Sequence, residues 1–111
     1  MGESEEKKAT KQALERIRKT GSDLRRPLTM DFFVAVPDES SGHTVADRAK
    51  LLGFSTAVEQ SEDDEWTCTC SKQLVATLEE VWSIEKLLDR LSADVQGYCD
   101  GFGSFGNAQS G

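Results

Sequence analysis

The sequence predicts an α+β sandwich, in which a four-stranded antiparallel sheet is covered on one face by two helices and an extra helix precedes it. Two observations predict this fold. The segment MDFFVAV, residues 30–36, is apolar on both sides of an extended chain, which is typical of a central strand. Segments of helical and of alternating periodicity then follow one another as strand, helix, strand, strand, helix and strand.

The N-terminal helix is expected to run from residue 5 to residue 20. Nothing breaks a helix in this segment, and a narrow apolar stripe recurs along it. The stripe consists of Ala9, Ala13 and Ile17, with Leu14 beside them. Gly21 then allows the left-handed conformation that ends a helix, so residues 1–28 are predicted to form a helix and a connecting loop.

The first strand, residues 30–36, is expected to end at Pro37, because proline cannot donate a backbone hydrogen bond. A helix is predicted after it. Its apolar side is formed by Val45, Ala49 and Leu52, whose spacing is helical, and Gly53 marks its end.

A hairpin is predicted next, from two segments in which larger apolar residues alternate with polar or small ones. The alternating residues are Phe54, Thr56 and Val58 in the first segment, and Trp66, Cys68 and Cys70 in the second. Residues 61–65 between them are mostly acidic and are expected to form a solvated turn. Each strand should therefore bury one face.

The longest helix is predicted from apolar residues that recur at spacings of three and four. These residues are Leu74, Leu78, Val81, Ile84, Leu88 and Leu91. Residues 95–99 are expected to form the last strand, and residues 100–106 hold too many glycines for a regular element. Residues 107–111 are expected to be a frayed tail.

This order of elements predicts a ferredoxin-like βαββαβ sandwich, because two right-handed crossovers joined by a hairpin place both helices on one face of the sheet. The ferredoxin-like domain is expected to span residues 29–106. Phe33 and Ala35 should point to the opposite, open face. The N-terminal helix is expected to pack across that face or at its edge.

Charge is unevenly distributed along the chain, whose net charge is −7. Residues 1–26 hold eight basic and five acidic residues, whereas the remainder holds five basic and 15 acidic ones. An acidic body repels a phosphate backbone, and the open face offers only Phe33 for stacking on bases, so direct nucleic-acid binding is not expected. With neither an apolar leader nor a run of about 18 apolar residues, we expect a cytoplasmic protein without a membrane span.

The residues that usually carry chemistry do not form a recognisable site in the sequence. Cys68, Cys70 and Cys99 are expected to be reduced thiols, and the first two lie two residues apart on a strand, without the spacing of a zinc knuckle. His43 is the sole histidine and no nucleophile motif accompanies it. We therefore expect no enzyme, no catalytic residues, no metal and no cofactor. Gly101 or Gly103 is expected to adopt a positive φ in a tight turn.

Three segments carry a resemblance to a known family: LERIRKTGSD at residues 14–23, the strand at 29–36, and DGFG at 100–103 after the leucine-rich helix. The chain resembles the regulator of ribonuclease E activity B (RraB) family. The resemblance implies three features of this family: a helix that ends in Gly-Ser-Asp, a ferredoxin-like sandwich and a terminal Tyr-Asp-Gly-Trp-Gly segment. Here Cys99 stands where the family has Tyr, and Phe102 replaces the Trp.

The resemblance implies a cytoplasmic bacterial protein that binds ribonuclease E and inhibits it without cutting RNA, which changes RNA turnover. The candidate contact residues are Asp100, Gly101, Phe102 and Phe105, since aromatic side chains beside glycines are suitable anchors for a protein partner. The alternative is a ferredoxin-like module that binds a small ligand or a different partner.

Overall fold

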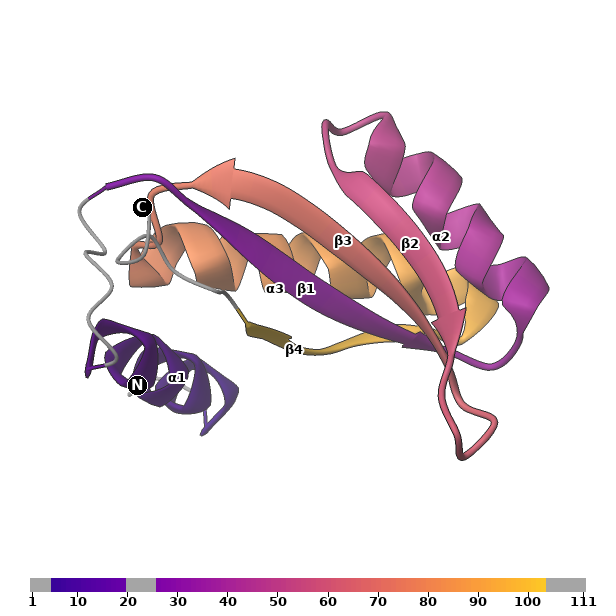
Figure 1. Cartoon of the computed structure of the whole chain (residues 1–111), viewed down its shortest axis with the longest axis horizontal. Helices are drawn as coiled ribbons and strands as arrows, with labels where there is room; N and C mark the ends of the chain where they lie inside the picture. Colours follow the sequence, from indigo (N-terminus) through magenta and orange to yellow (C-terminus); the bar gives the residue numbers. More distant parts are fainter. Residues whose placement is uncertain (1–4, 20–25, 104–111) are drawn as a thin grey trace.

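The structure is a computed structural model that describes residues 5–19 and 26–103. A layer of helices packs behind a sheet, and the first helix lies to one side (Figure 1). In chain order the elements are α1 (Glu5–Lys19), β1 (Leu28–Val36), α2 (Glu39–Lys50), β2 (Ser55–Gln60), β3 (Trp66–Leu74), α3 (Leu78–Ser92), a 3-10 helix (Ala93–Val95) and β4 (Tyr98–Gly103).

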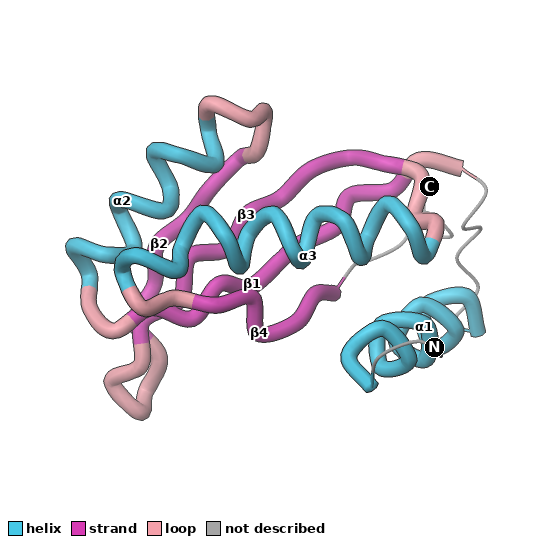
Figure 2. The backbone as a smooth tube through the Cα atoms, turned by 180° about the vertical axis from the view of Figure 1, so that it is seen from behind, coloured by secondary structure: helices cyan, strands magenta, loops and turns pink. Residues whose placement is uncertain are grey.

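The four strands form one antiparallel sheet in the order β2-β3-β1-β4. Strand β1 is central, and its residue Phe32 lies opposite Cys70 on one side and Phe102 on the other. Helices α2 and α3 cover the same face of the sheet (Figure 2). The predicted ferredoxin-like sandwich and the central position of the first strand are both confirmed.

Burial alternates strictly along β1, because successive side chains of a strand point to opposite faces. The helix-facing side chains are buried and form the centre of the core: Leu28, Met30, Phe32, Val34 and Val36. The other face carries Asp31, Phe33 and Ala35, which keep contact with solvent. The sheet therefore has one buried and one open face.

Helices α2 and α3 begin at side chains that cap their first turns. The Ser41 N–H donates to Asp38 at 2.8 Å, and this hydrogen bond lowers the pKa of the Asp38 carboxyl. The Glu80 N–H donates to the Thr77 hydroxyl at 3.1 Å. Helix α3 therefore starts at Leu78, later than predicted, because Leu74 still pairs with Leu28 as the end of β3.

The last strand differs from the prediction of a strand at residues 95–99 followed by an irregular glycine-rich segment. Val95 ends the 3-10 helix, and the strand runs from Tyr98 to Gly103. Gly97 sets the start of the strand, because a Cβ there would lie 2.9 Å from the Ser92 Cβ and 3.0 Å from the Ala35 carbonyl oxygen. Pairing with β1 then keeps the glycines in a regular element despite their low strand propensity.

Helix α1 lies beside α3, beyond the β4 edge of the sheet (Figures 1 and 2). Leu14 is buried in the core, and the Thr10 hydroxyl donates to Glu85 Oε1 of α3 at 2.6 Å. An ion pair of 3.5 Å joins Lys7 to Glu79. Because these contacts hold the helix against α3, it does not cross the open face, where Phe33 stays 37% exposed.

Phe32→Ala is expected to destabilise the protein by about 3–5 kcal/mol, because it leaves a cavity beneath the central strand. Phe32 is fully buried and its ring contacts those of Phe54 and Phe102. Urea unfolding followed by circular dichroism measures the loss, and Phe33→Ala on the open face is the matched control with a smaller effect. A loss below about 1 kcal/mol for Phe32→Ala would contradict the burial of this side chain.

Candidate functional site

Strand β4 carries three of the four predicted contact residues, and it is an edge strand of the sheet. Asp100 is exposed. Phe102 is partly buried, because its ring packs on the core 6.0 Å from the ring of Phe32. Phe105 lies outside the described residues. The structure thus brings Asp100, Gly101 and Phe102 together on one edge, with Asp100 as the residue most open to a partner.

A β-bulge determines how these residues are presented. Val34 pairs with Cys99 and Phe33 with Gly101, so Asp100 is the extra residue of β4 at this point. Gly101 has a φ of 139°, which L side chains rarely adopt. The prediction of a positive φ is confirmed at Gly101. The bulge turns Asp100 outward, and its side chain lines hollows on two sides of the edge.

The first hollow, of about 320 Å³, lies between α1, α3 and β4. Its polar side chains already bind one another: Thr10 donates to Glu85, and Lys86 lies 3.8 Å from the Asp89 carboxylate and over the Trp82 ring. Asp89 also accepts a hydrogen bond of 2.7 Å from the Cys99 backbone N–H, which satisfies a donor of the edge strand. The interactions among the residues that line this hollow therefore mainly hold α1 and β4 against α3.

A salt bridge between α2 and the 3-10 helix that follows α3 positions the chain just before β4. Arg48 of α2 donates to both carboxylate oxygens of Asp94, at 2.6 and 3.0 Å, and to the Leu91 carbonyl at 2.7 Å. The hydrogen bonds from Arg48 lower the pKa of the Asp94 carboxyl. This bidentate contact fixes the 3-10 turn, and with it the point where β4 enters the sheet.

The second hollow, of about 350 Å³, lies at the end of the sheet where β4 begins. Its lining combines the ring of Tyr98 with the carboxylates of Asp64, Glu65 and Asp100. Tyr98 is 54% exposed. Tyr98 was not predicted to be a surface aromatic residue, because the strand predicted at residues 95–99 did not show which face of the sheet its side chain takes. The neighbouring Cys99 was the available signal. Successive strand residues point to opposite faces, so an inward Cys99 indicates an outward Tyr98.

The cysteines behave as core residues. Cys68 and Cys70 are fully buried free thiols, as predicted, with their Sγ atoms 3.9 Å apart. The contact with Cys68 and burial both raise the pKa of the Cys70 thiol. Burial raises the pKa of Cys99 to about 12. Residues 5–19 and 26–103 hold no group of three or more His, Cys, Asp or Glu side chains that could bind a metal.

The architecture and the β4 edge define a small α+β domain whose exposed features are a bulged edge strand, surface aromatics and carboxylates. Over residues 7–104 the chain matches the family described as Regulator of ribonuclease activity B, and it belongs to this RraB family, as its resemblance predicted. A comparison with curated proteins finds no match. In the described part of the chain no helix is long and apolar enough to cross a membrane.

Gly101→Ala is expected to destabilise the protein by about 1–3 kcal/mol, because an alanine is strained at the positive φ of the bulge. Gly103→Ala is the matched control, since a Cβ there would make an ordinary contact of 3.7 Å with Phe33 Cε2. Thermal unfolding compares the two variants. Equal stability of Gly101→Ala and wild type would refute the strained bulge.

The stability of the protein is expected to fall at alkaline pH through Cys99. Its pKa is raised from about 8.5 in an unfolded chain to about 12, so the unfolded state loses this proton first. The contribution is complete below about pH 8.5 and is lost as the pH rises towards 12. Urea unfolding of wild type and Cys99→Ala across this range measures it. A variant whose stability falls as steeply as that of wild type would argue against the shift.

Proposed function

We propose that this chain is a non-catalytic regulator that binds a ribonuclease, with ribonuclease E as its partner, and slows the cleavage of RNA. The family match over residues 7–104 is the observation that carries the proposal. The regulator would act through shape and charge, through the surfaces that the described residues offer to a partner.

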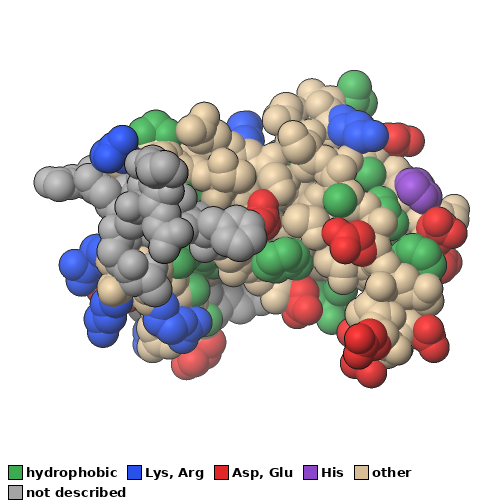
Figure 3. Space-filling view, in the orientation of Figure 1, with side chains coloured by type: hydrophobic (Ala, Val, Ile, Leu, Met, Phe, Trp, Pro, Cys, Tyr) green, Lys and Arg blue, Asp and Glu red, His purple; other side chains and the backbone are tan. Residues whose placement is uncertain are grey.

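The charge of the body supports a protein partner rather than an RNA partner. Residues 26–103 hold 15 acidic and six basic residues. On the face seen in Figure 3, acidic side chains gather around the turn between β2 and β3, and basic ones gather over α1. Such a body repels RNA phosphates and attracts the basic segments with which ribonucleases hold RNA. Occupying such a segment would weaken RNA binding without any chemistry.

The proposed contact includes the β4 edge at Asp100, Gly101 and Phe102, and Phe105 beyond it. Asp100 is presented by the bulge, and Gly101 leaves the backbone beside it open, because a Cβ at this position would meet nothing within 4 Å. Phe102 supports the edge from the core side. A partner can therefore approach this part of β4 closely.

Asp100→Lys is expected to weaken the binding of purified ribonuclease E about tenfold, because it reverses a charge at the proposed contact. Binding is measured by surface plasmon resonance and inhibition by the rate of RNA cleavage. The matched control is Asp47→Lys, which reverses an exposed charge on α2, away from β4. Binding of the wild type should also weaken as salt is added.

Two results would contradict the proposal. One is that the wild-type protein neither binds ribonuclease E at low salt nor slows its cleavage of RNA. The other is that wild type, Asp100→Lys and Asp47→Lys all bind ribonuclease E equally well, which would show that the β4 edge is not part of the contact.

A further inference from the structure

Among residues 5–19 and 26–103, no helix or strand covers the open face of the sheet. Helices α2 and α3 occupy the opposite face, and α1 packs beside α3. Strand register aligns the open-face side chains in three rows across β2, β3, β1 and β4. The rows are Ser55–Ser71–Asp31–Gly103, Ala57–Thr69–Phe33–Gly101 and Glu59–Thr67–Ala35–Tyr98.

Small side chains make this face flat around the rings of Phe33 and Tyr98. The neighbours of Phe33 in its row are Ala57, Thr69 and Gly101. The Phe33 ring lies beside the backbone of Gly103, where a Cβ would be 3.7 Å from the ring. Phe33 is 37% and Tyr98 is 54% exposed. An extended peptide can therefore lie on the face and contact both rings.

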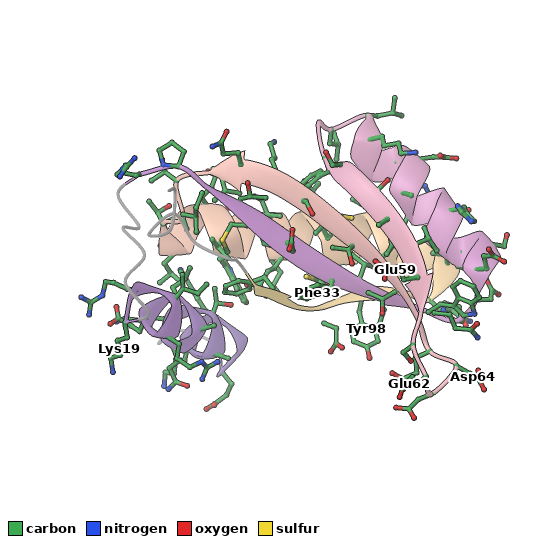
Figure 4. All side chains as sticks on the ribbon, viewed as in Figure 1. Lys19, Phe33, Glu59, Glu62, Asp64 and Tyr98 are labelled. Atoms are coloured by element: carbon green, nitrogen blue, oxygen red, sulfur yellow. The ribbon has the colours of Figure 1, made fainter. Side chains whose placement is uncertain are left out.

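The charge of this face has one sign. Its three rows hold the carboxylates of Asp31 and Glu59 and neither Lys nor Arg. Asp31 is oriented by the Ser71 hydroxyl, which donates to it at 2.6 Å. At the Tyr98 end of the face, the hollow adds Asp64, Glu65 and Asp100, and Figure 4 shows Asp64 in the turn that extends beyond Glu59 and Tyr98.

We propose that the open face is the surface on which a basic segment of the partner protein binds. Arginine fits it best, because a guanidinium stacks on an aromatic ring and pairs with carboxylates at the same time. One arginine would enter the hollow at Tyr98, and the segment would continue across Phe33. The identity of this partner as a ribonuclease rests on the proposed function, whereas the surface and its preference for basic peptide follow from these rows.

A basic partner fits this face better than a second copy of the chain. Each copy carries a net charge of −7, so two copies repel one another at long range. The exposed lysines and arginines of α1 are the one basic helix face in the described residues that a second copy would offer. Self-association is therefore the competing outcome of the test.

Nuclear magnetic resonance of the full chain tests the surface directly. An arginine-rich peptide is titrated into the ¹⁵N-labelled protein, with a peptide of equal length in which glutamine replaces arginine as the control. We expect amide shifts in Phe33, Thr67, Thr69 and Tyr98 with the arginine peptide alone. Shifts confined to α1 or α2, equal shifts with both peptides, or association of the protein with itself in sedimentation would overturn the proposal.

Variants of the open face separate this surface from other acidic regions. Glu59→Lys and Tyr98→Ala are each expected to weaken binding of the arginine peptide about tenfold, since each removes one of the two kinds of contact. The controls are Asp47→Lys for charge and Leu51→Ala for an exposed apolar side chain, both outside the sheet. Circular dichroism checks that each variant is folded. Equal losses in variants and controls would overturn the proposal.

Ribonuclease E distinguishes the two proposals from one another. If it binds wild type and Glu59→Lys equally, the surface is wrong and the proposed function stands. If it does not bind at all while the arginine peptide still contacts the open face, the proposed function is wrong and the surface stands. Loss of ribonuclease E binding in Glu59→Lys and Tyr98→Ala, but not in the controls, supports both.

Discussion

The burial of one side of β1 is the constraint on which the rest of the structure depends. Met30, Phe32 and Val34 are fully buried between the sheet and the helices, and the strand pairs with β3 on one side and β4 on the other. Because successive side chains of a strand point to opposite faces, the burial of Phe32 places Phe33 on the open face. The core thereby determines which side chains of the central strand remain available to a partner.

The β4 edge of the sheet departs from a regular strand in ways that limit pairing with a further strand. Unpaired edge strands invite further strands to pair with them. Here the Asp89 carboxylate accepts the Cys99 N–H, and the bulge at Asp100 and Gly101 interrupts the ladder. Helix α1 lies beyond the same edge, docked on α3 by Thr10 and Leu14. The edge is therefore protected against pairing with a further strand, whereas Asp100 stays exposed there, and the exposed aromatic side chains lie on the open face.

Basic and acidic side chains are concentrated at opposite ends of this small domain. The basic residues of α1 lie at one end, and the acidic turn between β2 and β3 lies at the other (Figures 3 and 4). Charged groups at a contact determine association rate and specificity more than affinity, so aromatic residues such as Tyr98 must supply much of the binding energy. In the proposed contact, charged groups and aromatic rings act together, and both occur on the open face.

The sequence by itself determined the class of fold, the central strand, the buried thiols and the family, because periodicity and local breakers such as Pro37 act over a few residues. It identified Asp100 and Gly101 as candidate contact residues, but it did not show the length of β4 or the face that Tyr98 takes. Those depend on pairing with β1 and on the close approach of Gly97 to Ser92. Only the tertiary structure decided the position of α1 and the three rows of the open face, because both arise from contacts between segments far apart in the chain.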